Sequence, residues 1–137
     1  MTNRDDLADL LASIYASFAG GDVSTFADRL ADDATMIGTD EAEWWDSKAA
    51  ALPVIQSQLE EMGEAGISLA GGDAVFGEHG DVVWAADRPT MTLPDGTTAS
   101  LRATVVAVRE GDRLVVKQMH LSAPAPNEEL VQTSLTV

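Results

Sequence analysis

The sequence contains no cysteine, which excludes a disulfide framework and a thiolate nucleophile. Basic side chains are scarce: 8 of them, only two being lysines (Lys48 and Lys117), stand against 23 acidic ones and leave a formal net charge of −15. A field of this sign repels nucleic-acid phosphate and anionic lipid. We therefore expect no nucleic acid and no membrane among the partners, and we interpret the acidity as a solvated surface.

Other absences narrow the classes further. No apolar run approaches the roughly 20 residues of a membrane span, and the first ten residues, MTNRDDLADL, lack the apolar segment of a signal peptide. The expected location is therefore the cytoplasm. The sequence has no D-x-D-x-D-G loop, no HExxH and no histidine cluster, so we expect no metal and no other cofactor.

The first half of the chain has the periodicity of helices. A first amphipathic helix is predicted over residues 4–19, ending at Gly20-Gly21. Asp22 is the expected N-cap of a short second helix through Leu30, and ATMIG then reads as a short strand. The apolar stripe of the first helix consists of Leu7, Leu10, Leu11, Ile14, Tyr15 and Phe18.

A third helix is predicted after the paired tryptophans. Its stripe is Leu52, Ile55, Leu59 and Met62, and it projects backwards through Trp45. Pro53 is awkward inside this stretch, so the helix either begins near Ala49 or kinks. Trp45 is expected to pack inward at the open end of the fold, as plain core or as a pocket lid, whereas Trp44 is rotated towards the surface.

The second half has the period of strands. Four segments, near 67–79, 81–93, 98–110 and 113–123, are separated by the turn sequences EHGD, LPDGT and REGD, which indicates an antiparallel meander. Helices followed by a meander predict one α+β domain over residues 4–123. The remaining residues, 124–137, are expected to form a partly disordered tail.

The last two strands are apolar on both faces, although helices can cover only one. We therefore expect a homodimer through the outer faces of the sheet, because an exposed patch of this size is unusual in a monomer. The residues expected to point outward are Val105, Ala107, Val115, Met119 and Leu121.

Five short motifs occur in a telling order: AGGD at 19–22, LADDAT at 30–35, GTDEAEWW at 38–45, R-x-T at 102–104 and KQMHLS at 117–122. Together they resemble the SnoaL-like branch of the nuclear transport factor 2-like superfamily, over residues 4–123. The resemblance implies a cone-shaped α+β fold in which three N-terminal helices close a strongly curved antiparallel sheet. It also implies an apolar cavity between helices and sheet, and dimers formed through the outer sheet faces.

That superfamily includes isomerases, cyclases, hydrolases, dehydratases and non-catalytic binders, so the fold does not give the function. Where the ketosteroid isomerases keep an aspartate base, the resemblance puts Gly38 in this chain. Their tyrosine falls near Ile14, one place from Tyr15, and their protonated acid falls near Thr104, so the isomerase apparatus is not matched. The acid/base aspartate of the SnoaL-type cyclases falls approximately at His120, and histidine is a residue type that commonly transfers protons in enzymes.

Strand parity groups the candidate site residues. His120 shares a face with Gln118, and Arg102 shares one with Thr104. If these faces are concave, the four side chains place polar groups in an apolar cavity, which is typical of a ligand pocket. The alternative is a self-satisfied network in which Arg102 pairs with Asp87 or Asp40 and His120 belongs to the core. Trp84, whose inward or outward orientation is left open, and Trp45 complete the candidate ligand-binding set.

Three functions remain in view. The first is a cavity that binds a small apolar or amphipathic molecule. The second is a cofactor-independent enzyme of the isomerase or cyclase type, with His120 as the catalytic general acid/base. The third is a dimerisation module that binds no ligand.

Overall fold

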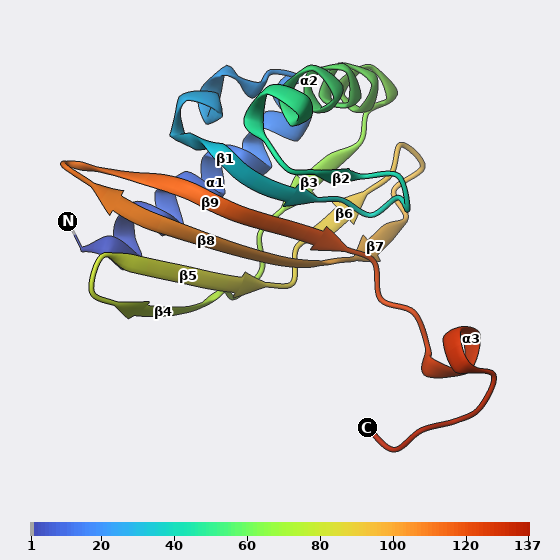
Figure 1. The fold of residues 1–137 in the computed structure, drawn as a ribbon. Helices are drawn as coiled ribbons and strands as arrows, with labels where there is room; N and C mark the ends of the chain where they lie inside the picture. Colours follow the sequence, from blue (N-terminus) through green and yellow to red (C-terminus); the bar gives the residue numbers. More distant parts are fainter. Residues whose placement is uncertain (1) are drawn as a thin grey trace.

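The computed structural model describes residues 2–137 and folds them into helices packed on one face of a curved sheet (Figure 1). The helical elements are α1 (Asn3–Gly20), η1 (Val23–Thr25), η2 (Ala27–Arg29), α2 (Lys48–Ala65) and α3 (Asn127–Val131), η denoting a 3-10 turn. The strands are β1 (Leu30–Ile37), β2 (Trp44–Trp45), β3 (Ser68–Ala70), β4 (Val75–His79), β5 (Val82–Asp87), β6 (Thr90–Thr92), β7 (Thr98–Ser100), β8 (Arg102–Glu110) and β9 (Arg113–Ser122). The predicted cone-shaped α+β fold is confirmed.

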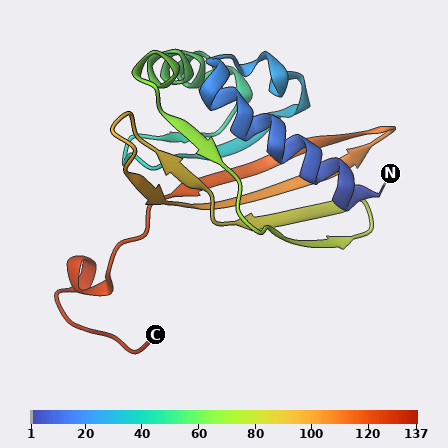
Figure 2. The same cartoon turned by 180° about the vertical axis from the view of Figure 1, so that it is seen from behind.

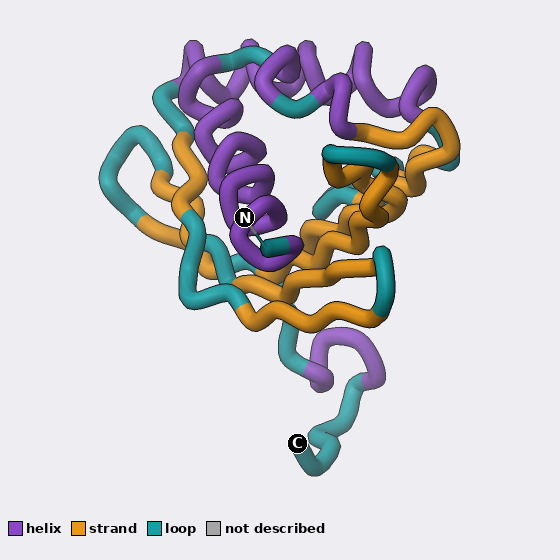
Figure 3. Tube along the Cα trace, turned by 90° about the vertical axis from the view of Figure 1, so that its left-hand side faces the viewer, coloured by secondary structure: helices purple, strands orange, loops and turns teal. Residues whose placement is uncertain are grey.

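Six strands form the main sheet in the order β2-β1-β9-β8-β5-β4, and β3-β6-β7 form a smaller one. Helix α1 lies diagonally across the main sheet (Figure 2), and α2 covers the side of β1. In the side view, the long helices and the strands lie on opposite sides of the core (Figure 3). The C-terminal segment that carries α3 extends away from the domain. Within residues 2–137, no helix is both long and apolar enough to cross a membrane.

The two long helices have strong local start and stop signals. The Thr2 hydroxyl accepts a hydrogen bond from the Asp5 amide while the Asp5 carboxylate accepts one from the Thr2 amide, which is a capping box for α1. Ser47 caps α2 through the Ala50 amide, and the helix then continues through Pro53. Both helices end at a glycine in the left-handed region, Gly21 or Gly66, where other residues are strained.

Several sequence-based expectations are wrong in detail. The second helix is replaced by η1 and η2, and Leu30 already belongs to β1, so two α-helices rather than three cover the sheet. The sheet is mixed rather than antiparallel, because β1 pairs in parallel with β9. The first three of the four β segments each break into two strands that join different sheets, around Gly71-Gly72, Pro89 and Leu101.

A β-bulge at Lys117 decides which side chains of β9 face the helices. Val106 of β8 is opposite Gln118, but the next residue, Ala107, is opposite Val116, so Lys117 has no partner on β8. An unpaired residue reverses the alternation of side chains beyond it. Leu114 and Val116 therefore point inward before the bulge, and Met119 and Leu121 point inward after it.

The inner face of the sheet forms the core with the helices. Helix α1 contributes its predicted stripe, of which Leu7 is fully buried, and α2 contributes Leu59. From the sheet come Val83, Ala85, Val105, Ala107, Leu114, Val116 and Met119. Val105, Ala107, Met119 and Leu121 were expected to point outward, and the structure corrects this, because all four pack on the helix side.

The carboxylate of Asp87 ties α1 to the sheet. This side chain is only 6% exposed, and its Oδ2 accepts a hydrogen bond of 2.7 Å from the Tyr15 hydroxyl. The Gly72 amide donates to both carboxylate oxygens, at 3.1 and 3.2 Å, and the Arg88 amide donates to Oδ1 at 2.8 Å. A side chain on Gly72 would collide with the Arg88 carbonyl oxygen, 2.6 Å from the Cβ position, so glycine is required for this close approach.

Burial raises the pKa of Tyr15 well above its ordinary value, and the hydrogen bond to Asp87 and the charge of that carboxylate act in the same direction. Tyr15 is the single tyrosine of the chain. Its protonated form is therefore favoured by folding, and its contribution to stability is complete below the ordinary pKa of about 10. As the pH rises above that value, the unfolded chain loses the Tyr15 proton first, so the contribution declines.

We predict that Tyr15→Phe lowers the free energy of unfolding by about 1–3 kcal/mol at neutral pH, because a hydrogen bond to a buried carboxylate is lost. Above about pH 10 this difference should shrink by roughly 1.4 kcal/mol for each further pH unit. Urea unfolding of both proteins at about pH 8 and about pH 11 measures it. A difference that is the same at the two pH values would contradict the buried, protonated Tyr15.

Candidate functional site

A cavity of about 310 Å³ lies between the helices and the β1–β9 side of the sheet. Its lining comes from α1, the Phe26 turn, β1, the β1–β2 loop, β2, α2, β6 and β9. The apolar lining residues are Ile14, Phe18, Phe26, Met36, Ile37, Trp45, Ile55, Leu59, Met62, Met91, Met119 and Leu121. The other lining residues are Gly38, Thr39, Glu43, Gln58 and Glu61, so an apolar concavity carries a few polar groups.

Methionine is concentrated in this wall. The chain has five methionines, and four of them, Met36, Met62, Met91 and Met119, line the cavity from four different elements. The thioether side chain is unbranched and polarisable, so it adapts to ligands of different outline and interacts well with aromatic rings. Four of the side chains in the cavity wall can therefore adapt their shape.

Glu43 and Gln58 form the polar element of the wall. Gln58 Nε2 donates to Glu43 Oε2 at 2.7 Å, and the Asp40 amide donates to Glu43 Oε1, also at 2.7 Å. The Glu43 carbonyl oxygen accepts from the Gly38 amide at 2.9 Å, which closes the β1–β2 loop. These bonds fix the carboxylate between the loop and α2, and they leave part of its acceptor capacity unused.

Gly38 is required beside this carboxylate. A Cβ atom on Gly38 would lie 2.8 Å from Glu43 Cδ and 2.9 Å from Glu43 Cβ, so the Glu43 side chain occupies the volume into which a residue-38 side chain would project. In the resemblance described above, position 38 corresponds to the aspartate base of the ketosteroid isomerases. In this chain a carboxylate reaches that region from five residues further on.

The predicted site residues divide between two faces of the sheet. Trp45 lines the cavity and packs against the core, and Trp44 is 61% exposed. Arg102 and Thr104 lie on the outer face, where they help to line a separate hollow of about 870 Å³ together with Arg88 and Pro124. The expectation that Arg102 and Thr104 line the helix-covered cavity is therefore corrected.

His120 and Gln118 are also on the outer face. His120 is in register with Thr104 on one side and Ile37 on the other, and Gln118 is in register with Val106. The sequence-based placement extended the parity of Leu114 and Val116 across Lys117, where the bulge reverses it. A detectable signal existed: the apolar spacing changes from two residues to three between Val116 and Met119.

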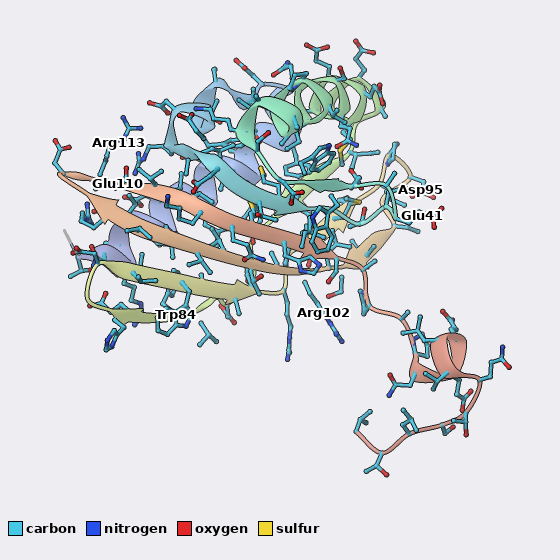
Figure 4. All side chains as sticks on the ribbon, viewed as in Figure 1. Glu41, Trp84, Asp95, Arg102, Glu110 and Arg113 are labelled. Atoms are coloured by element: carbon cyan, nitrogen blue, oxygen red, sulfur yellow. The ribbon has the colours of Figure 1, made fainter. Side chains whose placement is uncertain are left out.

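Trp84 lies on the outer face as well, 42% exposed, and Figure 4 shows it and Arg102 on the side of the sheet away from the helices. Its ring lies against Gly77 of the neighbouring strand, since a Cβ on Gly77 would be 2.5 Å from the indole. Around it, the outer face carries an apolar group that we call the outer patch: Val75, Val82, Trp84, Ala86, Val106, Val108 and Val115.

Sequence reasoning missed Glu43 and Gln58. Glu43 sits two residues before Trp45, directly before β2, and this spacing was an available signal that both side chains point to the same side. Gln58 is next to the stripe residue Leu59 on α2 and has no distinctive pattern around it. Among residues 2–137 there is no group of three or more histidine, aspartate or glutamate side chains arranged to hold a metal ion.

Comparisons with known proteins agree on the fold. The sequence model of the SnoaL-like domain matches residues 7–126. An NTF2-like protein of unknown function from Pseudomonas putida KT2440 superposes with a TM-score of 0.78 at 20% identity, covering 98% of this chain and 96% of that one. An NTF2-like protein with a cystatin-like fold from Novosphingobium aromaticivorans gives 0.76 at 16% identity, with 96% and 89% covered. The comparison with curated proteins gives no match.

Gly38→Ala tests the packing of Glu43. The added methyl group collides with the Glu43 side chain at its Cβ as well as at its end, so we expect a loss of about 1–3 kcal/mol in the free energy of unfolding. Gly20→Ala is the matched control, because nothing lies within 4 Å of its Cβ position. Urea unfolding of both variants measures the effect, and equal stabilities would contradict the described position of Glu43.

Proposed function

Because this chain belongs to the SnoaL-like domain family, whose model covers residues 7–126, we propose that it binds a small apolar or amphipathic molecule in the cavity between its helices and its sheet. The observation that carries the proposal is the wall itself: an apolar lining of methionine, aromatic and aliphatic side chains interrupted by the hydrogen-bonded pair Glu43 and Gln58. Burial of apolar ligand surface would supply affinity at about 25 cal/mol per Å², and the polar pair would orient the ligand.

The two alternatives fit the geometry less well. An enzyme using His120 would need that imidazole in the cavity, whereas His120 pairs with Thr104 on the outer face. A dimerisation module without a ligand would need no hydrogen-bonded polar pair on the wall of an apolar cavity, whereas the half-buried Glu43 and Gln58 form such a pair. Glu43 and Gln58 therefore favour ligand binding.

We further propose that two copies associate through the outer faces of their sheets. The outer patch supports this, since Val75 is 70% and Trp84 42% exposed, and contiguous apolar surface of this kind marks interaction sites. In a homodimer with two-fold symmetry, the outer patch of one protomer would pack against the same patch of its partner.

For the cavity, we predict that Ile55→Trp weakens binding of the neutral fluorescent probe N-phenyl-naphthylamine at least about tenfold, because the indole would fill space that the ligand needs. Ile55 lines the cavity, whereas the preceding residue, Val54, is 42% exposed, so Val54→Trp is the control. Fluorescence titration reads out affinity, and thermal melting checks that both variants fold. Unchanged affinity in Ile55→Trp, or no binding by the unmodified protein, would refute the proposal.

For the interface, we predict a dimer at micromolar concentration that Val106→Glu combined with Val108→Glu converts to a monomer. Both residues point outward from β8, and a pair of buried carboxylates at an interface is strongly unfavourable. Val54→Glu, a comparable change on the exposed side of α2, should leave the dimer intact. Light scattering measures the molecular mass of each protein in solution, and a monomeric unmodified protein would rule out the interface.

A further inference from the structure

The charged side chains of the cavity wall are all acidic. Among residues 2–137, the side chains that line the cavity include Glu43 and Glu61 but no lysine, arginine or histidine. Three of the basic side chains are instead held in ion pairs at other places, Arg109 with Asp6, Arg113 with Asp28 and Lys117 with Asp33. A ligand with a negative charge would meet carboxylates and no cation in this cavity.

The carboxylate of Glu43 is held ready to accept hydrogen bonds. Its two oxygens are fixed by the Asp40 amide and by Gln58 Nε2, both at 2.7 Å, so it does not have to reorganise when a ligand arrives. A carboxylate accepts up to about four hydrogen bonds, and two are used here. A ligand group that uses the remaining acceptor sites of Glu43 must be a hydrogen-bond donor. A charged donor such as an ammonium forms a stronger hydrogen bond with a carboxylate than a neutral donor does.

The rest of the wall favours the same ligand. Phe18, Phe26 and Trp45 contribute aromatic rings to the wall, and aromatic rings attract cations as well as flat apolar groups. The net charge of −15 adds a long-range field that raises the local concentration of cations and repels anions. The aromatic wall, the Glu43 carboxylate and the negative net charge of the protein therefore all favour a cationic ligand.

We infer that the cavity takes a small apolar amine, with its ring system among the methionine and aromatic side chains and its ammonium group at Glu43, and that it rejects the corresponding carboxylate. This inference rests on the proposed binding function and adds the chemical class of the ligand. It places recognition in the loop between β1 and β2, which carries Glu43, rather than in the strand residues of the outer face.

Three probes with one ring system test it: naphthylmethylamine, naphthalenemethanol and naphthoate, which are cationic, neutral and anionic at neutral pH. Calorimetric titration of the unmodified protein should show the amine binding about tenfold to a hundredfold more tightly than the alcohol, as expected for a hydrogen bond to a charged group. The naphthoate should bind more weakly than either.

Glu43→Gln should bring the affinity for the amine down to that for the alcohol and leave the affinity for the alcohol nearly unchanged. Glu41→Gln is the control, because this neighbouring carboxylate is exposed and does not line the cavity. Should Glu43→Gln fail to fold, the three affinities of the unmodified protein still decide the question.

The outcomes separate the inference from the function on which it rests. Equal binding of amine and alcohol, or preference for the naphthoate, would overturn the inference and leave the binding function standing. Failure of all three probes to bind would overturn both.

Discussion

The arrangement of the cavity depends on the single unpaired residue in β9. Lys117 has no partner on β8, and its ammonium lies 3.1 Å from the Asp33 carboxylate in β1, where the register with β9 also shifts. Because side chains alternate along a strand, this one residue puts Met119 and Leu121 on the cavity wall and His120 outside. Without it, the end of β9 would present a histidine and an amide to the helices.

A second constraint fixes the far side of the core. Asp87 accepts hydrogen bonds from α1, from the loop after β3 and from the adjacent amide of Arg88, so this one carboxylate ties α1 and the β3–β4 loop to the end of β5. Breaking such a network costs more than the sum of its bonds suggests, because the buried charge would be left without donors. The cavity lies beyond this anchored region, between α2 and the β1–β9 side of the sheet, where four methionines belong to the wall.

The fold could be predicted from the sequence because its signals are local and repeated. The stripe of α1, the caps at Gly21 and Gly66 and the turns of the second half each act within a few residues. The candidate site was harder to predict from the sequence, since it depends on which face of each strand the helices cover. In β8 both faces are apolar, so Val105 and Val106 look alike in sequence although only Val105 is buried, and the bulge at Lys117 is visible only as a changed apolar spacing.

The concentration of methionine around the cavity affects which ligands the proposed binding site would accept. Four thioether side chains can change rotamer with little loss of contact, so the apolar part of the wall is soft and sets only a loose limit on shape. The Glu43 carboxylate is stiff by comparison, because two hydrogen bonds hold it. Under the proposed binding function, such a cavity would accept apolar ligands of many shapes but of few charges, and different compounds with the same polar group would compete for it.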